Sequence, residues 1–115
     1  MPKRRRAKPK AVLAGSAPVF AALGDETRLR LVIRLCSDGP MSIAQLTAGF
    51  AITRQAITKH LRVMKSAGLV RSMQQGRESV WEIEQKRLSE ARRHLDAISS
   101  QWDATLERLK DFVER

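Results

Sequence analysis

The chain has 115 residues, with 22 Lys and Arg against 12 Asp and Glu, which gives a formal net charge of +10 at pH 7. This length suits one domain with a single core, and the excess of positive charge attracts polyanions such as nucleic acid. No apolar run approaches the roughly 20 residues that span a membrane, and the single cysteine excludes an internal disulfide. We therefore expect a cytoplasmic protein that binds nucleic acid.

A flexible basic arm is predicted at residues 1–15. Its first ten residues hold six Lys and Arg, two prolines and no acid. Such a segment stays extended and solvated because its charges repel one another and it has little apolar surface to bury. The sequence leaves open whether Arg4, Arg5 and Arg6 contact DNA or only keep the protein soluble.

A short first helix is predicted from Ala17. Apolar side chains recur there with helical spacing, at Val19, Phe20 and Leu23. Gly24 comes next, and glycine is typical just past the last residue of a helix. We therefore expect this helix to end there.

A second helix is predicted between Asp25 and Gly39. Aspartate is a favoured N-cap, and a glycine followed by a proline ends a helix. Apolar residues that recur every three or four positions predict its buried face: Leu29, Val32, Ile33 and Cys36. A free cysteine is often a small core residue, so we interpret Cys36 as buried rather than as a redox sensor.

Two further helices are predicted on either side of a turn at residues 49–52. Ser42 can cap the first of them, which carries Ile43, Leu46 and Phe50. A helix pair joined by such a tight turn is typical of DNA-binding domains, in which the second helix enters the major groove.

The second helix of this pair is predicted at residues 53–67. Thr53 is its N-cap, and Gly68 is placed to end it. Its apolar positions at i, i+4 and i+7 are Ile57, Leu61 and Met64. Since these face the core, the opposite face of the helix is polar and exposed.

A hairpin and a long helix complete the chain. Residues 69–73 and 79–83 have extended character and are joined by the glycine-containing segment 74–78. Residues 85–113 contain no Gly or Pro. Apolar residues form a stripe along this helix: Leu88, Ala91, Leu95, Ile98, Trp102, Leu106, Leu109 and Val113.

The predicted fold class is mainly α with a two-stranded β wing, in the order of four helices, two strands and a fifth helix. This is a winged helix-turn-helix. We divide it into the arm, a DNA-binding domain at residues 16–84 and a dimerisation helix at residues 85–115.

The polar face of residues 53–67 carries side chains that suit DNA: Thr53, Arg54, Gln55, Thr58, Lys59 and Arg62. Arginine pairs with guanine and glutamine pairs with adenine. Both arginine and lysine bind phosphate. From Gly39 to Arg77 there is no acid and there are six basic residues. The sequence therefore predicts binding of double-stranded DNA.

Two further residues are candidates for DNA contact. Arg77, beside Gly76 in the hairpin, can reach the adjacent minor groove or a phosphate, or remain a solvated turn residue. His60 can donate to a phosphate or pack under the hairpin, and the sequence does not separate these roles.

Other classes of function fit less well. No nucleophile with a base, metal cluster or phosphate-binding loop indicates an enzyme. A protein-interaction module of the same fold, or a nonspecific nucleic-acid binder, stays as the alternative. RNA readers usually stack bases on exposed aromatic residues, and this basic region has only Phe50.

Four segments resemble the ArsR family of winged-helix repressors, over roughly residues 17–84. They are "ALGDETRLRLVIRL", "GPMSIAQL", "TRQAITKHLRVMKSAGLV" and "GRESVWEI". The resemblance implies a homodimeric repressor on an imperfectly palindromic operator, released when an inducer binds. It also implies that Arg54, Gln55, Thr58 and Lys59 occupy the base-reading positions.

Dimer contacts are predicted on the first and last helices. The expected residues are Phe20, Leu95, Ile98, Trp102, Leu106 and Leu109. Trp102 lies on the apolar stripe of a helix too long for so small a domain to cover, so a dimer seam is the better interpretation than a ligand pocket. Trp81, in the hairpin, is interpreted as core.

The sequence departs from the metal-sensing members of the family. Residues 42–50, where many of them have a cysteine site, contain no Cys or His. The last helix offers only His94 beside scattered acids, and zinc usually needs at least one more nitrogen or sulfur ligand. We predict no metal and no cofactor; an unknown small molecule is the remaining candidate inducer.

Overall fold

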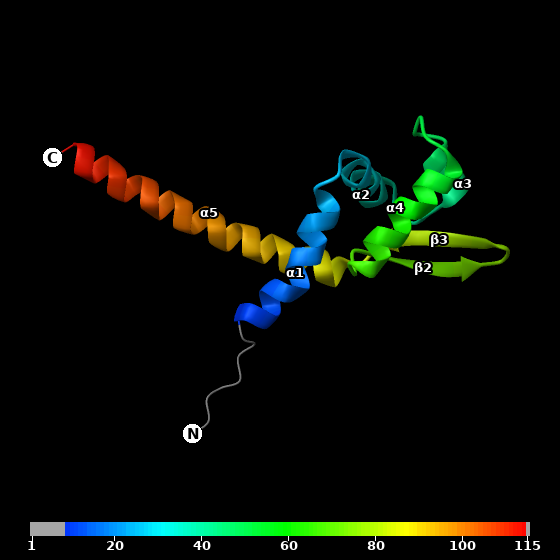
Figure 1. The fold of residues 1–115 in the computed structure, drawn as a ribbon, viewed down its shortest axis with the longest axis horizontal. Coiled ribbons are helices and arrows are strands. Elements are labelled where there is room, and N and C mark those ends of the chain that lie inside the picture. The colour runs from blue at the N-terminus through cyan, green and yellow to red at the C-terminus, as the bar shows by residue number, and fades with distance from the viewer. Residues whose placement is uncertain (1–8, 115) are drawn as a thin grey trace, which may run out of the picture.

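The computed structural model describes residues 9–114 and contains the predicted helices, hairpin and long final helix (Figure 1). The elements, in chain order, are α1 (Pro9–Leu23), α2 (Glu26–Asp38), β1 (Met41–Ser42), α3 (Ile43–Thr47), α4 (Arg54–Ser66), β2 (Val70–Gln75), β3 (Glu78–Ile83) and α5 (Gln85–Val113). The fold class predicted from the sequence is confirmed, with β1 as an additional strand.

Helix α1 begins earlier than predicted. It starts at Pro9, so the prediction of a flexible arm was wrong for residues 9–15, while residues 1–8 lie outside the described part. Proline is favoured in the first turn of a helix, where its missing amide hydrogen has no partner to lose. The helix also continues through Pro18, because α1 packs against α5 and buries Ser16 and Val19.

Helix α2 has the predicted bounds but a different buried face. Asp25 caps it by accepting a hydrogen bond from the Arg28 amide at 3.0 Å. The buried residues are Leu31, Val32 and Leu35, whereas the predicted residues Leu29, Ile33 and Cys36 are exposed. Both sets have helical spacing, so periodicity alone could not choose between them.

The caps of α3 and α4 are as predicted. Ser42 forms a capping box with Gln45, and the Thr53 hydroxyl accepts a hydrogen bond from the Ala56 amide. Gly68 adopts φ +80° after α4, and its amide donates to the Lys65 carbonyl oxygen. A positive φ suits glycine, so this residue ends α4 at low cost.

Helix α3 is shorter than predicted. Since it ends at Thr47, Phe50 lies in the following turn, where it is half-buried against the core. The helix-turn-helix unit therefore consists of a short α3 and a full-length α4.

Strand β3 is the centre of a three-stranded antiparallel sheet in the order β1-β3-β2. The β2–β3 pairing continues to Gln75 and Glu78, so the wing turn holds only Gly76 and Arg77 rather than residues 74–78. Strand β1 was not predicted because two residues give no alternating pattern. It pairs Met41 with Trp81 and so attaches the start of α3 to the wing.

The core lies between the helices and the sheet. Its fully buried apolar side chains come from the first four helices and from the residue just before β2: Val19, Leu31, Leu46, Ile57, Leu61, Met64 and Leu69. Trp81 is only 6% exposed, which confirms its interpretation as core.

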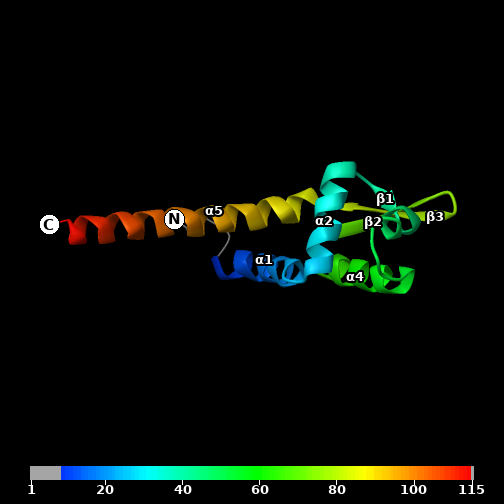
Figure 2. The same cartoon turned by 90° about the horizontal axis from the view of Figure 1, so that it is seen from above.

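Helix α5 joins this core only near its start. Ala91 is its buried residue, and Leu88 packs against the core from the side. The helix is 29 residues long, about 44 Å at 1.5 Å per residue, and beyond this contact it runs away from the domain (Figures 1 and 2).

Candidate nucleic-acid interface

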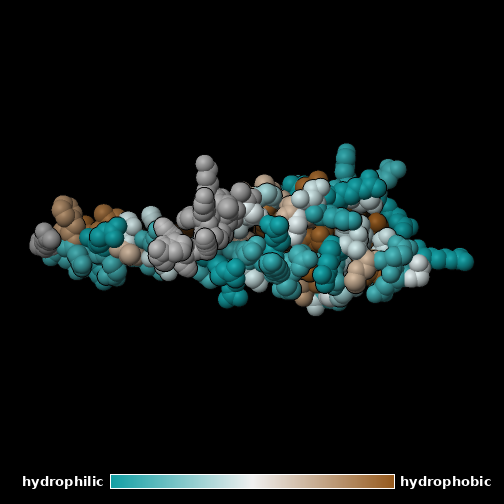
Figure 3. Space-filling view, turned by 90° about the horizontal axis from the view of Figure 1, so that it is seen from below, coloured by the Kyte–Doolittle hydropathy of each residue, from teal (hydrophilic) through white to brown (hydrophobic). Residues whose placement is uncertain are grey.

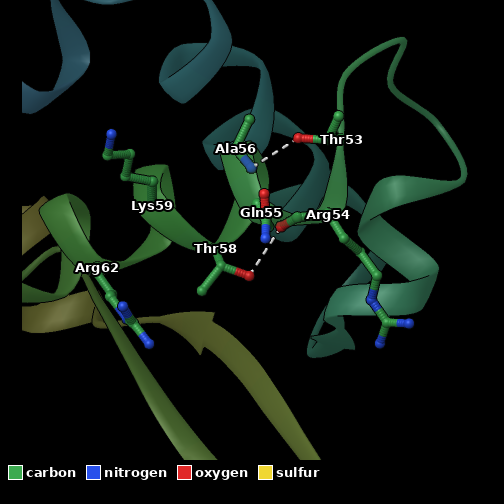
Figure 4. Close-up of a pocket in the computed structure, with 7 residues that line it drawn as sticks. All are labelled: Thr53, Arg54, Gln55, Ala56, Thr58, Lys59 and Arg62. Atoms are coloured by element: carbon green, nitrogen blue, oxygen red, sulfur yellow. Dashed lines mark hydrogen bonds between the residues drawn. The ribbon is translucent and has the colours of Figure 1, made fainter.

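The outer face of α4 gathers six of the residues predicted to contact DNA. Together with Ala56, they line a concave surface that encloses a volume of about 590 Å³ (Figure 4). The six residues are Thr53, Arg54, Gln55, Thr58, Lys59 and Arg62. They face outward because Ile57, Leu61 and Met64, on the opposite side of the helix, are fully buried. The local amphipathic pattern therefore sets which side chains are available to a ligand.

Two hydrogen bonds order the first turns of this face. The Thr53 hydroxyl accepts from the Ala56 amide at 3.1 Å, which fixes the start of α4. The Thr58 hydroxyl donates to the Arg54 carbonyl oxygen at 2.9 Å (Figure 4). Gln55 lies between them, exposed and with its amide directed away from the core.

His60 belongs to a different surface. Its Nδ1 lies 3.4 Å from an Arg28 guanidinium nitrogen and 3.9 Å from a carboxylate oxygen of Asp25, at the start of α2. This contact is neither of the two roles that the sequence left open, since the ring packs against α2 rather than under the hairpin. We therefore do not assign His60 a DNA contact.

The carboxylate of Asp25 also takes part in this junction. Its pKa is lowered from the ordinary value, chiefly because it accepts a hydrogen bond from the Arg28 amide, with smaller contributions from the Arg28 and His60 charges. The cap of α2 is therefore ionised at neutral pH and contacts the side of α4 opposite the basic surface.

The basic residues of the segment between Gly39 and Arg77 fall into two groups. Arg71 pairs across the hairpin with Glu82 at 3.1 Å, and Lys65 donates to Ser72 while lying over the Trp81 ring. These two basic side chains are occupied within the protein. The sequence could not show this for Arg71, because its partner is set by the strand register.

The second group comprises Arg54, Lys59, Arg62 and Arg77. Within residues 9–114, none of these four side chains forms an ion pair. They are also exposed. Within this segment, the positive charge that has no ion pair thus lies on α4 and at the tip of the wing.

The residues predicted to form the dimer lie on α1 and α5. The five on α5 are 45–60% exposed, which is high for large apolar side chains. They are Leu95, Ile98, Trp102, Leu106 and Leu109. Apolar surface is visible toward the C-terminal end of α5 in Figure 3.

Phe20 is half-buried and lies at the base of this apolar surface. It lines a groove of about 310 Å³ between α1 and α5, together with Leu23, Leu88 and Leu95 among others. The structure thus brings the residue predicted on the first helix next to the start of the stripe on the last.

Two kinds of feature are absent from the residues that the structure describes. No group of three or more His, Cys, Asp or Glu side chains is arranged to hold a metal ion there. Over the same part of the chain, no helix has the length and apolar character that crossing a membrane requires.

Comparison with known proteins finds relatives that are helix-turn-helix transcriptional regulators. Residues 23–72 match a family model described as a helix-turn-helix domain. The chain is 35% identical over 77 residues to the HTH-type transcriptional regulator Rv2034 of Mycobacterium tuberculosis, covering 67% of this chain and 71% of the relative. It is 40% identical over 65 residues to the uncharacterised HTH-type regulator YuzN of Bacillus subtilis, covering 51% and 71%.

A solved structure extends the similarity over nearly the whole chain. An ArsR-like transcriptional regulator from Rhodococcus sp. RHA1 aligns with a TM-score of 0.73 and 35% identity, covering 89% of this chain and 95% of that one.

Proposed function

Because the chain belongs to the ArsR family of winged helix-turn-helix transcriptional regulators, we propose that it binds an imperfectly palindromic DNA operator as a homodimer and represses transcription. The observation that carries the proposal is the outer face of α4, where polar and unpaired basic side chains converge opposite a fully buried apolar face. Such a face fits the major groove of B-DNA in width and in hydrogen-bonding chemistry.

Base reading is assigned to Gln55 and Thr58, at the start of α4. The Gln55 amide presents a donor and an acceptor together, which matches the N6 and N7 edge of adenine. Lys59 and Arg62 follow on the same face and supply charge for phosphate or guanine. The wing brings Arg77 toward the neighbouring backbone or minor groove.

The dimer is assigned to α1 and α5, with residues 16–84 as the DNA-binding domain and residues 85–115 as the dimerisation helix. An apolar stripe of this length is unfavourable in water, and a second copy would cover it. A symmetric dimer then offers two α4 helices to two half-sites.

Repression and its release by an inducer follow from the family rather than from any residue described above. A DNA-bound regulator of this kind works in the cytoplasm, and a small molecule is the proposed class of inducer.

The test is binding by a Gln55→Ala variant to the preferred duplex and to a random duplex of equal length. Loss of a bidentate base contact costs about 1–3 kcal/mol, so we expect roughly a 5- to 150-fold weaker affinity for the preferred duplex. Affinity for the random duplex should hardly change. Ser66→Ala, an exposed change at the far end of α4, is the matched control. Equal losses on both duplexes would refute base reading by Gln55.

A further inference from the structure

A second, smaller concavity lies between the start of α4 and the tip of the wing. It has a volume of about 180 Å³ and joins three parts of the chain that are distant in sequence. Its lining residues are Ser42, Ile43, Ala44, Arg54, Arg77, Glu78 and Ser79. Since β1 pairs with β3, the start of α3 forms the wall between α4 and the wing.

Two arginines from opposite sides share this concavity. Arg54 is the first residue of α4, and Arg77 lies in the wing turn. In Figure 4 the Arg54 side chain extends away from Lys59 and Arg62 rather than along the face they form. Arg54 is therefore placed differently from the other basic residues of α4.

Neither guanidinium is neutralised in the protein as described. Glu78 lines the same concavity, yet no ion pair within 4.0 Å links it to Arg54 or Arg77. By contrast, Arg71 on β2 does pair with Glu82 on the neighbouring strand and with Glu84 just after it. Two unpaired like charges that line one hollow suit an anion that binds both.

The backbone at both arginines is held in place. The Thr53 cap fixes the first turn of α4. In the wing, the Gln74 amide donates to the Gly76 carbonyl oxygen at 3.2 Å and accepts from the Ser79 hydroxyl at 3.3 Å, which braces the turn around Arg77. Little ordering of the backbone is needed when a ligand binds.

The anion that fits this position on B-DNA is a phosphate of the sugar-phosphate backbone. One sugar-phosphate strand separates the major groove from the adjacent minor groove, so a protein with α4 in the first and its wing at the second must straddle that strand. The hollow between α4 and the wing is where the strand would pass.

We propose that Arg54 and Arg77 bind the same backbone phosphate from its two sides, a contact that rests on the DNA-binding function proposed above. Arg54 is then a phosphate ligand rather than a base reader, and this contact fixes the wing relative to α4 on the duplex. Phosphate contacts of this kind set the register of a protein on DNA without reading sequence.

The test uses the preferred duplex with single methylphosphonate substitutions, each of which removes the charge of one phosphate. For the wild-type protein, one position per half-site should weaken binding strongly. Arg54→Gln and Arg77→Gln should each bind the natural duplex more weakly, and each should be less sensitive than the wild type at that same position. The double variant should not be sensitive there at all. Arg62→Gln removes an exposed arginine of α4 outside this hollow, so it should keep the sensitivity.

The salt dependence of affinity gives an independent readout. Each neutralised phosphate contributes about 0.9 to the slope of log affinity against log salt concentration. If the two arginines share one phosphate, the double variant should lose about 0.9 per half-site; if each binds its own phosphate, it should lose about 1.8.

Two results would overturn the shared contact. Either the two variants become less sensitive at two different positions, or neither becomes less sensitive at any position. A wild-type protein that prefers no duplex sequence at all would instead overturn the proposed function itself, and the shared contact with it.

Discussion

The hydroxyl of Thr58 donates a hydrogen bond to the carbonyl oxygen of Arg54, one helical turn earlier, at 2.9 Å. This bond uses the hydroxyl proton and selects one rotamer of a β-branched side chain. In that rotamer the methyl group points away from the Arg54 carbonyl, into the concave surface of α4 (Figure 4). A threonine methyl group makes apolar contact with the methyl group of thymine in the major groove.

We therefore predict that Thr58 acts in DNA binding through its methyl group. Thr58→Val keeps the methyl group and should bind the preferred duplex about as tightly as the wild type. Thr58→Ser keeps the hydroxyl and should lose about 0.8 kcal/mol, or roughly fourfold in affinity, for one buried methyl group. The measurement is a titration of each variant against the same duplex.

Replacing thymine by uracil in the duplex provides the matched control, since it removes only the base methyl group. The wild type and Thr58→Val should lose affinity on one uracil substitution per half-site, and Thr58→Ser should not. A Thr58→Val variant that loses affinity while Thr58→Ser keeps it would show that the hydroxyl, and not the methyl group, contacts DNA.

The exposed stripe of α5 leads to a prediction about assembly. Leu106 is 45% exposed and lies well beyond the part of α5 that contacts the core. Leu106→Asp should therefore leave the domain folded but convert the dimer to a monomer, because a carboxylate would be buried at the seam. Sedimentation equilibrium measures the mass.

Ser100→Asp adds the same charge to α5 at an exposed position outside the apolar stripe, and it should leave the dimer intact. If Leu106→Asp sedimented as a dimer as well, the seam would have to lie elsewhere on the molecule.

The Asp25 cap makes stability depend on pH in a defined direction. Its folded pKa is lowered by the hydrogen bond from the Arg28 amide, so the ionised form is favoured by folding. The stabilisation is present above the unfolded pKa of about 3.9 and is lost as the pH falls through the lower folded value. Asp25→Ala should thus melt at a lower temperature than the wild type at pH 7, and the gap should narrow below about pH 4.

Asp25→Asn separates the cap from the charge, because asparagine also caps helices well. It should melt between the wild type and Asp25→Ala at pH 7. Thermal melts across the acid range give all three curves, and a gap of constant size for Asp25→Ala would contradict the role of the carboxylate.

The parts of the fold that depend on local signals were predictable from the sequence. Asp25, Thr53 and Gly68 act on their own neighbours through capping bonds or a positive φ, so the ends of α2 and α4 could be placed. The apolar face of α4 could also be assigned, and with it the opposite, polar face.

The parts that depend on tertiary contacts were not predictable. The packing of the domain decides which of two apolar faces of α2 is buried. Cys36 lies on the other face and is exposed. The two residues of β1 are a strand only because Trp81 and its neighbour pair with them. In the candidate site, the contact of His60 with Arg28 depends on how α4 lies against α2.

The central claim is that this protein reads a specific DNA sequence as a dimer, and selection from a pool of random duplexes by the purified protein tests it most directly. The mass of the protein in solution is measured on the same sample. We predict a palindromic motif with half-sites about one helical turn, roughly 10 bp, apart, together with a dimeric mass. A folded dimer that enriches no motif would contradict the claim and favour nonspecific nucleic-acid binding or a protein partner.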